Sequence, residues 1–106
     1  MFSIFGKANY ESISVHDLDG KLGKINLIDV REIYEYKGGH VPTAKNISMG
    51  TILASPEKHL NKTTKYHIIC QSGGRSGKTC KELSTLGYKV TNISGGTGSY
   101  ILPLEK

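Results

Sequence analysis

The chain has 106 residues, of which 37% are hydrophobic and 22% charged, and a formal net charge of +5. This length is typical of one domain and too short for two independent cores, so residues 1–106 are predicted to form a single domain. No segment approaches the roughly 20 apolar residues that span a bilayer, which predicts a soluble protein with no membrane partner. Residues 1–7 lack the features of a signal peptide, so we expect a cytoplasmic location.

The positive charge comes from lysines spread along the chain, without the dense block that marks a nucleic-acid arm. We therefore expect no nucleic-acid partner, and the charge weakly favours attraction of small anions or of an acidic partner surface. The two cysteines, Cys70 and Cys80, are too few for a disulfide framework, and their spacing is neither a metal pair nor a Cys-x-x-Cys redox motif. The sequence thus predicts no metal and no other cofactor, and without an apolar heptad a monomer is the default expectation.

The apolar pattern predicts alternating strands and helices. Strands are expected, in chain order, at residues 12–15, 24–30, 44–48, 66–70 and 88–94. Helical or mixed patterns are expected at residues 15–22, 31–37, 49–60 and 76–86. The runs at 24–30 and 66–70 are nearly continuous, as in strands covered on both faces, whereas 44–48 looks like an edge strand. This order predicts an α/β fold, a three-layer sandwich with a small, mostly parallel central sheet flanked by helices.

Cys70 stands at the position most typical of function in such a fold. It ends a predicted central strand, and a glycine-rich turn separates it from the next helix, which Gly87 is expected to stop. Backbone N–H groups of the small residues in this turn can point inward together and form an anion cradle at the helix N-terminus; these are Ser72, Gly73, Gly74 and Arg75. Such a cradle, with help from the Arg75 side chain, lowers a cysteine pKa below about 8.5 and makes Cys70 a nucleophile.

The alternative is that Cys70 is a small core residue, which is the usual role of a free cysteine. For Cys80 that interpretation is favoured, because it shares an apolar helical stripe with Leu83 and with Leu86 or Gly87.

The segment Cys70-Gln71-Ser72-Gly73-Gly74-Arg75 resembles the Cys-x-x-Gly-x-Arg active loop of the rhodanese homology domain. Three further segments resemble that family in order and spacing: Ile28-Asp29-Val30-Arg31, Gly39-His40-Val41-Pro42-Thr43-Ala44-Lys45-Asn46-Ile47 and Gly95-Gly96-Thr97-Gly98-Ser99-Tyr100. The chain departs from the family pattern at Thr43, where glycine is usual, and at Tyr100, where tryptophan is usual. We expect these changes to alter the turn near residue 43 and the C-terminal packing.

The resemblance implies a sulfurtransferase of the thiosulfate:cyanide class. Cys70 would take sulfane sulfur from a small anionic donor, such as thiosulfate or a low-molecular-weight persulfide, and pass it from a Cys70 persulfide to cyanide or an acceptor thiol, which can belong to a protein. It also implies substrate-binding roles for the rest of the loop, namely Gln71, Ser72, Gly73, Gly74, Arg75 and Ser76. Asp29 and Arg31 would brace the loop, and His40 is expected to be structural. Related phosphatases and arsenate reductases carry one more loop residue, so this loop length favours sulfur.

Three other interpretations remain at this point. Residues 72–79 nearly match the nucleotide-binding pattern Gly-x-x-x-x-Gly-Lys-Thr, although its first glycine is missing and no later strand ends in an aspartate for magnesium. The fold could instead serve as a regulatory binding module, or Cys70 could be a redox sensor. Within the loop, a positive φ is expected at Gly74.

Overall fold

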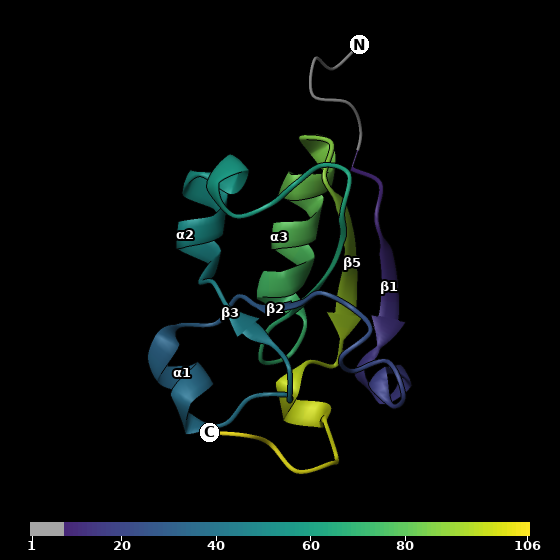
Figure 1. Cartoon of the computed structure of the whole chain (residues 1–106), viewed down its shortest axis with the longest axis vertical. Helices are drawn as coiled ribbons and strands as arrows, with labels where there is room; N and C mark the ends of the chain where they lie inside the picture. Colours follow the sequence, from purple (N-terminus) through teal and green to yellow (C-terminus); the bar gives the residue numbers. More distant parts are fainter. Residues whose placement is uncertain (1–7) are drawn as a thin grey trace.

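The computed structural model describes residues 8–106, so the prediction about residues 1–7 lies outside the described residues. Its centre is a sheet with the strand order β1-β5-β4-β2-β3, and all four neighbouring pairs are parallel (Figure 1). The strands are β1 (Glu11–Ser14), β2 (Leu27–Asp29), β3 (Lys45–Asn46), β4 (Lys65–Ile69) and β5 (Lys89–Ser94). The predicted α/β class with a parallel sheet is confirmed, and the short strands β1 and β3 form its two edges.

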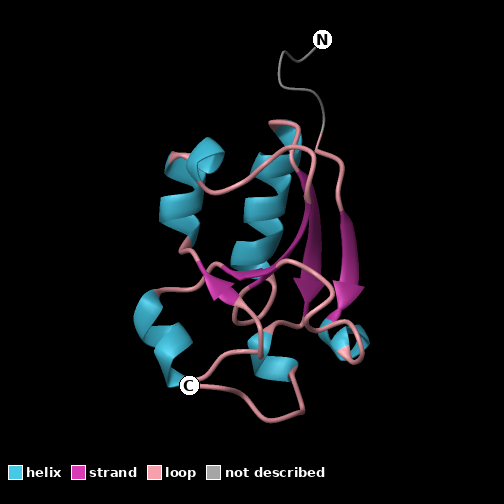
Figure 2. Cartoon of the chain, in the orientation of Figure 1, coloured by secondary structure: helices cyan, strands magenta, loops and turns pink. Residues whose placement is uncertain are grey.

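The helices cover the two faces of the sheet unequally. They are α1 (Ile33–Gly38), α2 (Met49–Ala54) and α3 (Gly74–Thr85), together with the 3-10 turns η1 (Val15–Leu18), η2 (Pro56–Lys58) and η3 (Thr97–Ser99). The two helices α2 and α3 lie side by side against one face (Figure 2). The other face packs against η1, the segment 41–44 and the side chains of Tyr36 and Tyr100. The third layer of the sandwich is therefore thin, made mostly of turns and loops.

The strand predicted at residues 24–30 is shorter in the structure. Only Leu27–Asp29 has strand geometry, because the preceding residues form turns in which the Lys24 N–H donates to the Lys21 carbonyl at 2.9 Å. All three β2 residues are buried. The central position predicted for this strand is right, and its start was placed too early.

Helix α3 begins at Gly74, two residues before the predicted start, and is the longest helix in the described chain at 12 residues. Its buried stripe follows the i, i+3, i+4, i+7 spacing of a helix that faces a core, with Ser76, Thr79, Cys80 and Leu83 on that side. Leu86, which was predicted as a possible member of this stripe, is instead 38% exposed. No helix in residues 8–106 is long and apolar enough to cross a bilayer.

Thr43 is the one non-glycine residue among residues 8–106 that has a positive φ, at 74°. It lies in the turn closed by the Ala44 N–H donating to the Val41 carbonyl at 3.1 Å. A β-branched side chain is strained in this conformation, which glycine adopts freely. The turn thus holds a residue poorly suited to its backbone conformation.

We expect Thr43→Gly to raise the free energy of unfolding by about 0.5–1 kcal/mol, because relief of left-handed strain exceeds the added entropy of the unfolded chain. Urea unfolding measures this change. Thr43→Ala is the matched control, since alanine loses the side chain but keeps the strained Cβ. Equal stability of the glycine and alanine variants would contradict the strain argument.

Candidate active site

Cys70 follows β4 directly and lies at the carboxyl end of the parallel sheet, where α1, η3 and the C-terminal segment also gather (Figure 1). This is the end at which open α/β sheets bind ligands. The residue is fully buried, whereas its neighbours Gln71 and Ser72 are exposed. The loop therefore folds over its own cysteine.

The Cys70 sulfur is held by neutral groups from the start of α3. The Gly73 N–H donates to Sγ at 3.1 Å, and Sγ lies 3.3 Å from Oγ of Ser76. Ser76 is itself fully buried, and its hydroxyl also lies 3.2 Å from the Gly73 carbonyl. When the thiol ionises, this hydroxyl can turn its proton toward the sulfur.

These contacts change the pKa of the Cys70 thiol. Burial alone would raise the pKa, but the Ser76 hydroxyl and the N–H groups of Ser76, Gly73 and Ser72 favour the thiolate and together lower it below the ordinary value. The neutral donors thus outweigh desolvation. A thiolate held in this way needs no neighbouring base to become a nucleophile.

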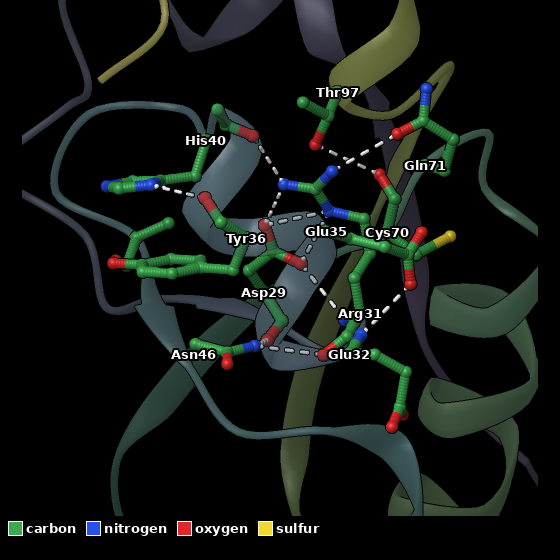
Figure 3. Close-up of polar contacts among 12 residues, drawn as sticks. Asp29, Arg31, Glu32, Glu35, Tyr36, His40, Asn46, Cys70, Gln71 and Thr97 are labelled. Carbon is green, nitrogen blue, oxygen red and sulfur yellow. Dashed lines mark hydrogen bonds and ion pairs between the residues drawn. The ribbon is translucent and has the colours of Figure 1, made fainter. Parts of the chain in front are cut away.

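Asp29 and Arg31 form a buried ion pair that reaches the loop (Figure 3). Arg31 Nη2 lies 2.9 Å from Oδ2 of Asp29 and also donates to the Gly39 carbonyl at 2.8 Å. Its Nη1 donates to Oε1 of Gln71 at 3.2 Å. The structure therefore brings the two predicted bracing residues together and connects them to the second loop residue.

His40 lies at the end of α1 rather than in the reacting centre. Its Nδ1 is 2.9 Å from the Tyr36 carbonyl, and its ring stacks on that of Tyr36 with 3.7 Å between centroids. These contacts are those of a structural residue.

A backbone clamp from the segment after β5 holds the start of the loop. The Thr97 N–H donates to the Cys70 carbonyl at 2.9 Å, and the Gly98 N–H donates to the Gln71 carbonyl at 2.9 Å. A Cβ at Gly96 would lie 2.5 Å from both carbonyl oxygens, so only glycine fits there. The sequence identified residues 95–100 as a segment that resembles the family, but no local signal indicated that its backbone binds the carbonyl of Cys70.

Arg75 does not direct its side chain at the sulfur as expected from the sequence. Its guanidinium forms a bidentate pair with Glu35 on α1, with 2.7 Å from Nη1 to Oε1 and 2.9 Å from Nη2 to Oε2. Sequence reasoning missed Glu35, because its partner lies 40 residues away and α1 offers no local reason to single it out.

The left-handed residue of the loop is Gly73, with a φ of 108°, and not Gly74 as expected. Gly74 is the first residue of α3 and has open space around its Cβ position. The positive φ falls one residue earlier because Gly73 is the N-cap, where the chain turns into the helix.

The remaining candidate residues, Cys80 and Thr79, are buried, which argues against a functional role for either. Cys80 is fully buried. Burial, and to a lesser extent the negative charge of Cys70, raises the pKa of its thiol to about 12, which supports a structural role. Thr79 is also fully buried and donates its hydroxyl to the Arg75 carbonyl at 2.7 Å, so it cannot hold a magnesium ion as a nucleotide-binding threonine does. In residues 8–106 no three His, Cys, Asp or Glu side chains are grouped as metal ligands.

Comparison with known proteins places this fold and loop in one family. The model of the rhodanese-like domain matches residues 14–101, so the chain belongs to the rhodanese-like domain family. A crystal structure of SSP1007 from Staphylococcus saprophyticus superposes with a TM-score of 0.82 at 33% identity, covering 91% of this chain and 99% of that one.

Two relatives from Bacillus subtilis differ in how much of their length the chain matches. "Putative sulfurtransferase YtwF" is 45% identical over 75 residues, which are 69% of this chain and 70% of that protein. "Putative sulfur carrier protein YrkF" is 36% identical over 73 residues, which are 68% of this chain but only 39% of that protein.

Ser76→Ala should raise the pKa of Cys70, because the hydroxyl that favours the thiolate is lost. The rate of alkylation by iodoacetamide, measured against pH, reports this pKa. As the pH falls through the lowered pKa, the wild-type rate should decline, and the variant should decline at higher pH. Cys80 stays protonated in this range.

Ser84→Ala, near the other end of α3, is the matched control and should keep the wild-type profile. Superimposable profiles for Ser76→Ala and the wild type would rule out the hydroxyl as the activating group.

Gly73→Ala and Gly74→Ala form a matched pair that tests the loop geometry. The first should lower the free energy of unfolding by about 1–2 kcal/mol, since alanine resists a positive φ. The second should change it by less than about 0.5 kcal/mol, because position 74 is helical and open. Urea unfolding of both variants gives the comparison, and a larger loss at Gly74 would overturn the assignment of the left-handed residue.

Proposed function

We propose that this protein is a sulfurtransferase in which Cys70 accepts sulfane sulfur as a persulfide and passes it on. The donor is a small anion such as thiosulfate or a low-molecular-weight persulfide, and the acceptor is cyanide or a thiol, including a thiol on another protein. The observation that carries this proposal is the position of the Cys70 sulfur among the N–H of Gly73 and the hydroxyl of Ser76. The names of its relatives, which include a thiosulfate sulfurtransferase from Arabidopsis thaliana, support the same class.

In the first half of the cycle, the Cys70 thiolate attacks the outer sulfur of the donor. With thiosulfate, a new bond forms between the Cys70 sulfur and the sulfane sulfur, and the bond to the sulfite sulfur breaks. Its electron pair leaves with sulfite, so Cys70 becomes a persulfide anion and the total charge is unchanged. No external oxidant is needed, because the transferred sulfur is already at the sulfane oxidation level, and no base is needed, because Cys70 reacts as a thiolate.

In the second half, the acceptor attacks the outer sulfur of the persulfide. Cyanide gives thiocyanate, and a thiolate gives a new persulfide; in both cases the electron pair returns to the Cys70 sulfur. The loop N–H groups that favour the thiolate then stabilise this leaving group. One set of dipoles therefore serves both steps.

The full burial of Cys70 sets a condition on both steps. A donor therefore reaches the sulfur only when part of the loop moves aside. The exposed Ser72 is the residue best placed for such movement, because Gln71 before it is held by Arg31 and by the Gly98 N–H.

Incubation of the wild-type protein with thiosulfate or glutathione persulfide should add one sulfur atom to its intact mass, and cyanide should remove it. Cys70→Ser should gain nothing, because the nucleophile is lost, while Cys80→Ser should gain one sulfur as the wild type does. Intact-mass spectrometry before and after cyanide measures each state.

Sulfur gain by Cys70→Ser would disprove the role of this residue. No gain with any sulfane donor, together with oxygen addition at Cys70 on peroxide treatment, would replace sulfur transfer by the redox-sensor function.

A further inference from the structure

The charges beside the active loop are already balanced within the protein. The chain contains only two arginines, Arg31 and Arg75, and both lie at this loop. Arg31 is paired with buried Asp29 and also donates hydrogen bonds to the Gly39 carbonyl and the Gln71 side-chain oxygen. Both guanidinium charges are therefore already paired with a carboxylate of the protein.

Glu35 is the residue that occupies Arg75. Its two carboxylate oxygens accept both Nη groups of Arg75, and Oε1 also accepts the Glu32 N–H at 3.0 Å. The hydrogen bond from Arg75 is the largest influence on this carboxyl and lowers the pKa of Glu35 to about 2, so the pair is ionised on both sides at neutral pH. Bidentate pairing fixes the guanidinium more firmly than a single contact would.

The charge of Arg75 nonetheless extends to the reacting sulfur. Arg75 lies in the first turn of α3 between Gly73 and Ser76, the two residues that contact the sulfur at 3.1 and 3.3 Å. The pKa of Arg75 is raised mainly by its hydrogen bonds with Glu35, and the negative charge of Cys70 raises it further. Without Glu35, this guanidinium would be an unpaired cation next to the bound donor. With Glu35, the donor meets mainly the neutral dipoles of Gly73 and Ser76.

Neutral N–H and O–H dipoles carry only partial positive charge, so they offset the second negative charge of a dianionic donor less well than an unpaired guanidinium would. Thiosulfate brings two negative charges to the site. A thiosulfonate or an alkyl persulfide brings one on its transferring group. The missing free cation should therefore penalise the dianion selectively.

We propose that Glu35 is a specificity-determining residue, which by occupying Arg75 makes the site favour singly charged sulfane donors over dianionic thiosulfate. This inference rests on the proposed sulfur transfer and names the donor class for the same cysteine. For a thiosulfonate, the Cys70 thiolate forms a bond to the outer sulfur, the S–S bond of the donor breaks, and the electron pair leaves with the sulfinate. Charge and atoms balance as they do for thiosulfate and sulfite.

Thiosulfate and methanethiosulfonate are a matched pair of probes, because they differ mainly in one charged oxygen replaced by a methyl group. With cyanide as acceptor, both donors yield thiocyanate, so one assay gives kcat/KM for each. Glu35→Gln should raise kcat/KM for thiosulfate by about tenfold, a modest gain for one freed cation, and change that for methanethiosulfonate by less than about twofold. The gain should shrink as ionic strength rises.

Glu32→Gln is the matched control, because it removes one acidic charge from the same end of α1 without freeing Arg75; both donors should change by less than about twofold. Arg75→Gln tests the opposite direction and should depress thiosulfate use more than methanethiosulfonate use. Thermal unfolding of each variant checks that it is folded. If either Glu35→Gln or Arg75→Gln does not fold, the other variant still tests the proposal.

An equal change for both donors in Glu35→Gln and in Arg75→Gln would overturn the specificity role and leave Glu35 as a structural partner of Arg75. If wild-type Cys70 accepts sulfur from neither donor, the proposed function itself fails. The two failures are therefore distinguishable.

Discussion

The buried ion pair between Asp29 and Arg31 is the interaction on which the arrangement of the active end depends. It fixes the end of β2, because Oδ1 of Asp29 accepts the Arg31 N–H at 3.0 Å. It reaches the end of α1 through the Gly39 carbonyl and the active loop through Gln71. Asn46 at the end of β3 adds donations to the carbonyls of both members. A buried pair contributes little net stability after desolvation, but its directional contacts position the segments it joins.

The site that results activates sulfur with dipoles and keeps its cations paired. Desolvation opposes ionisation of Cys70, so the N–H groups and the Ser76 hydroxyl must do more than offset burial. An unpaired arginine at the same place would favour the thiolate further, but it would also bind any anion that enters. Pairing of Arg75 with Glu35 separates these two effects, because the neutral donors still lower the pKa of Cys70 while both guanidinium charges are paired with carboxylates.

The sequence was sufficient to predict those parts of the fold that depend on local pattern. The apolar run at β4, the glycine turn and the helix that follows it fixed the βαβ unit and the place of Cys70, and Gly87 has the left-handed φ of 98° expected of a helix stop. The start of β2 was misplaced because an apolar run does not show where the preceding turn ends. Gly73 and Gly74 could not be told apart, since the difference lies in where the helix begins.

The contacts that were not predicted join residues far apart in the sequence. Glu35 and Arg75 are separated by 40 residues, and the Thr97 hydroxyl donates to the carbonyl of Cys70, 27 positions earlier. Such pairs depend on how α1 and η3 pack at the end of the sheet, which no residue pattern in either segment specifies. Family resemblance located Asp29 and Arg31, but it did not indicate that Gln71 is the loop residue they hold.

The distribution of these constraints shows which part of the loop is held least firmly. The carbonyls of Cys70 and Gln71 are clamped by the backbone of residues 97 and 98, and from Gly74 onward the chain is helical. Between these fixed points lie exposed Ser72 and the left-handed Gly73, whose N–H contacts the sulfur. The sulfur transfer proposed above requires this short segment to move, because Cys70 is fully buried. The same segment carries the Gly73 N–H that favours the thiolate, so access to the sulfur and its activation would depend on one peptide unit.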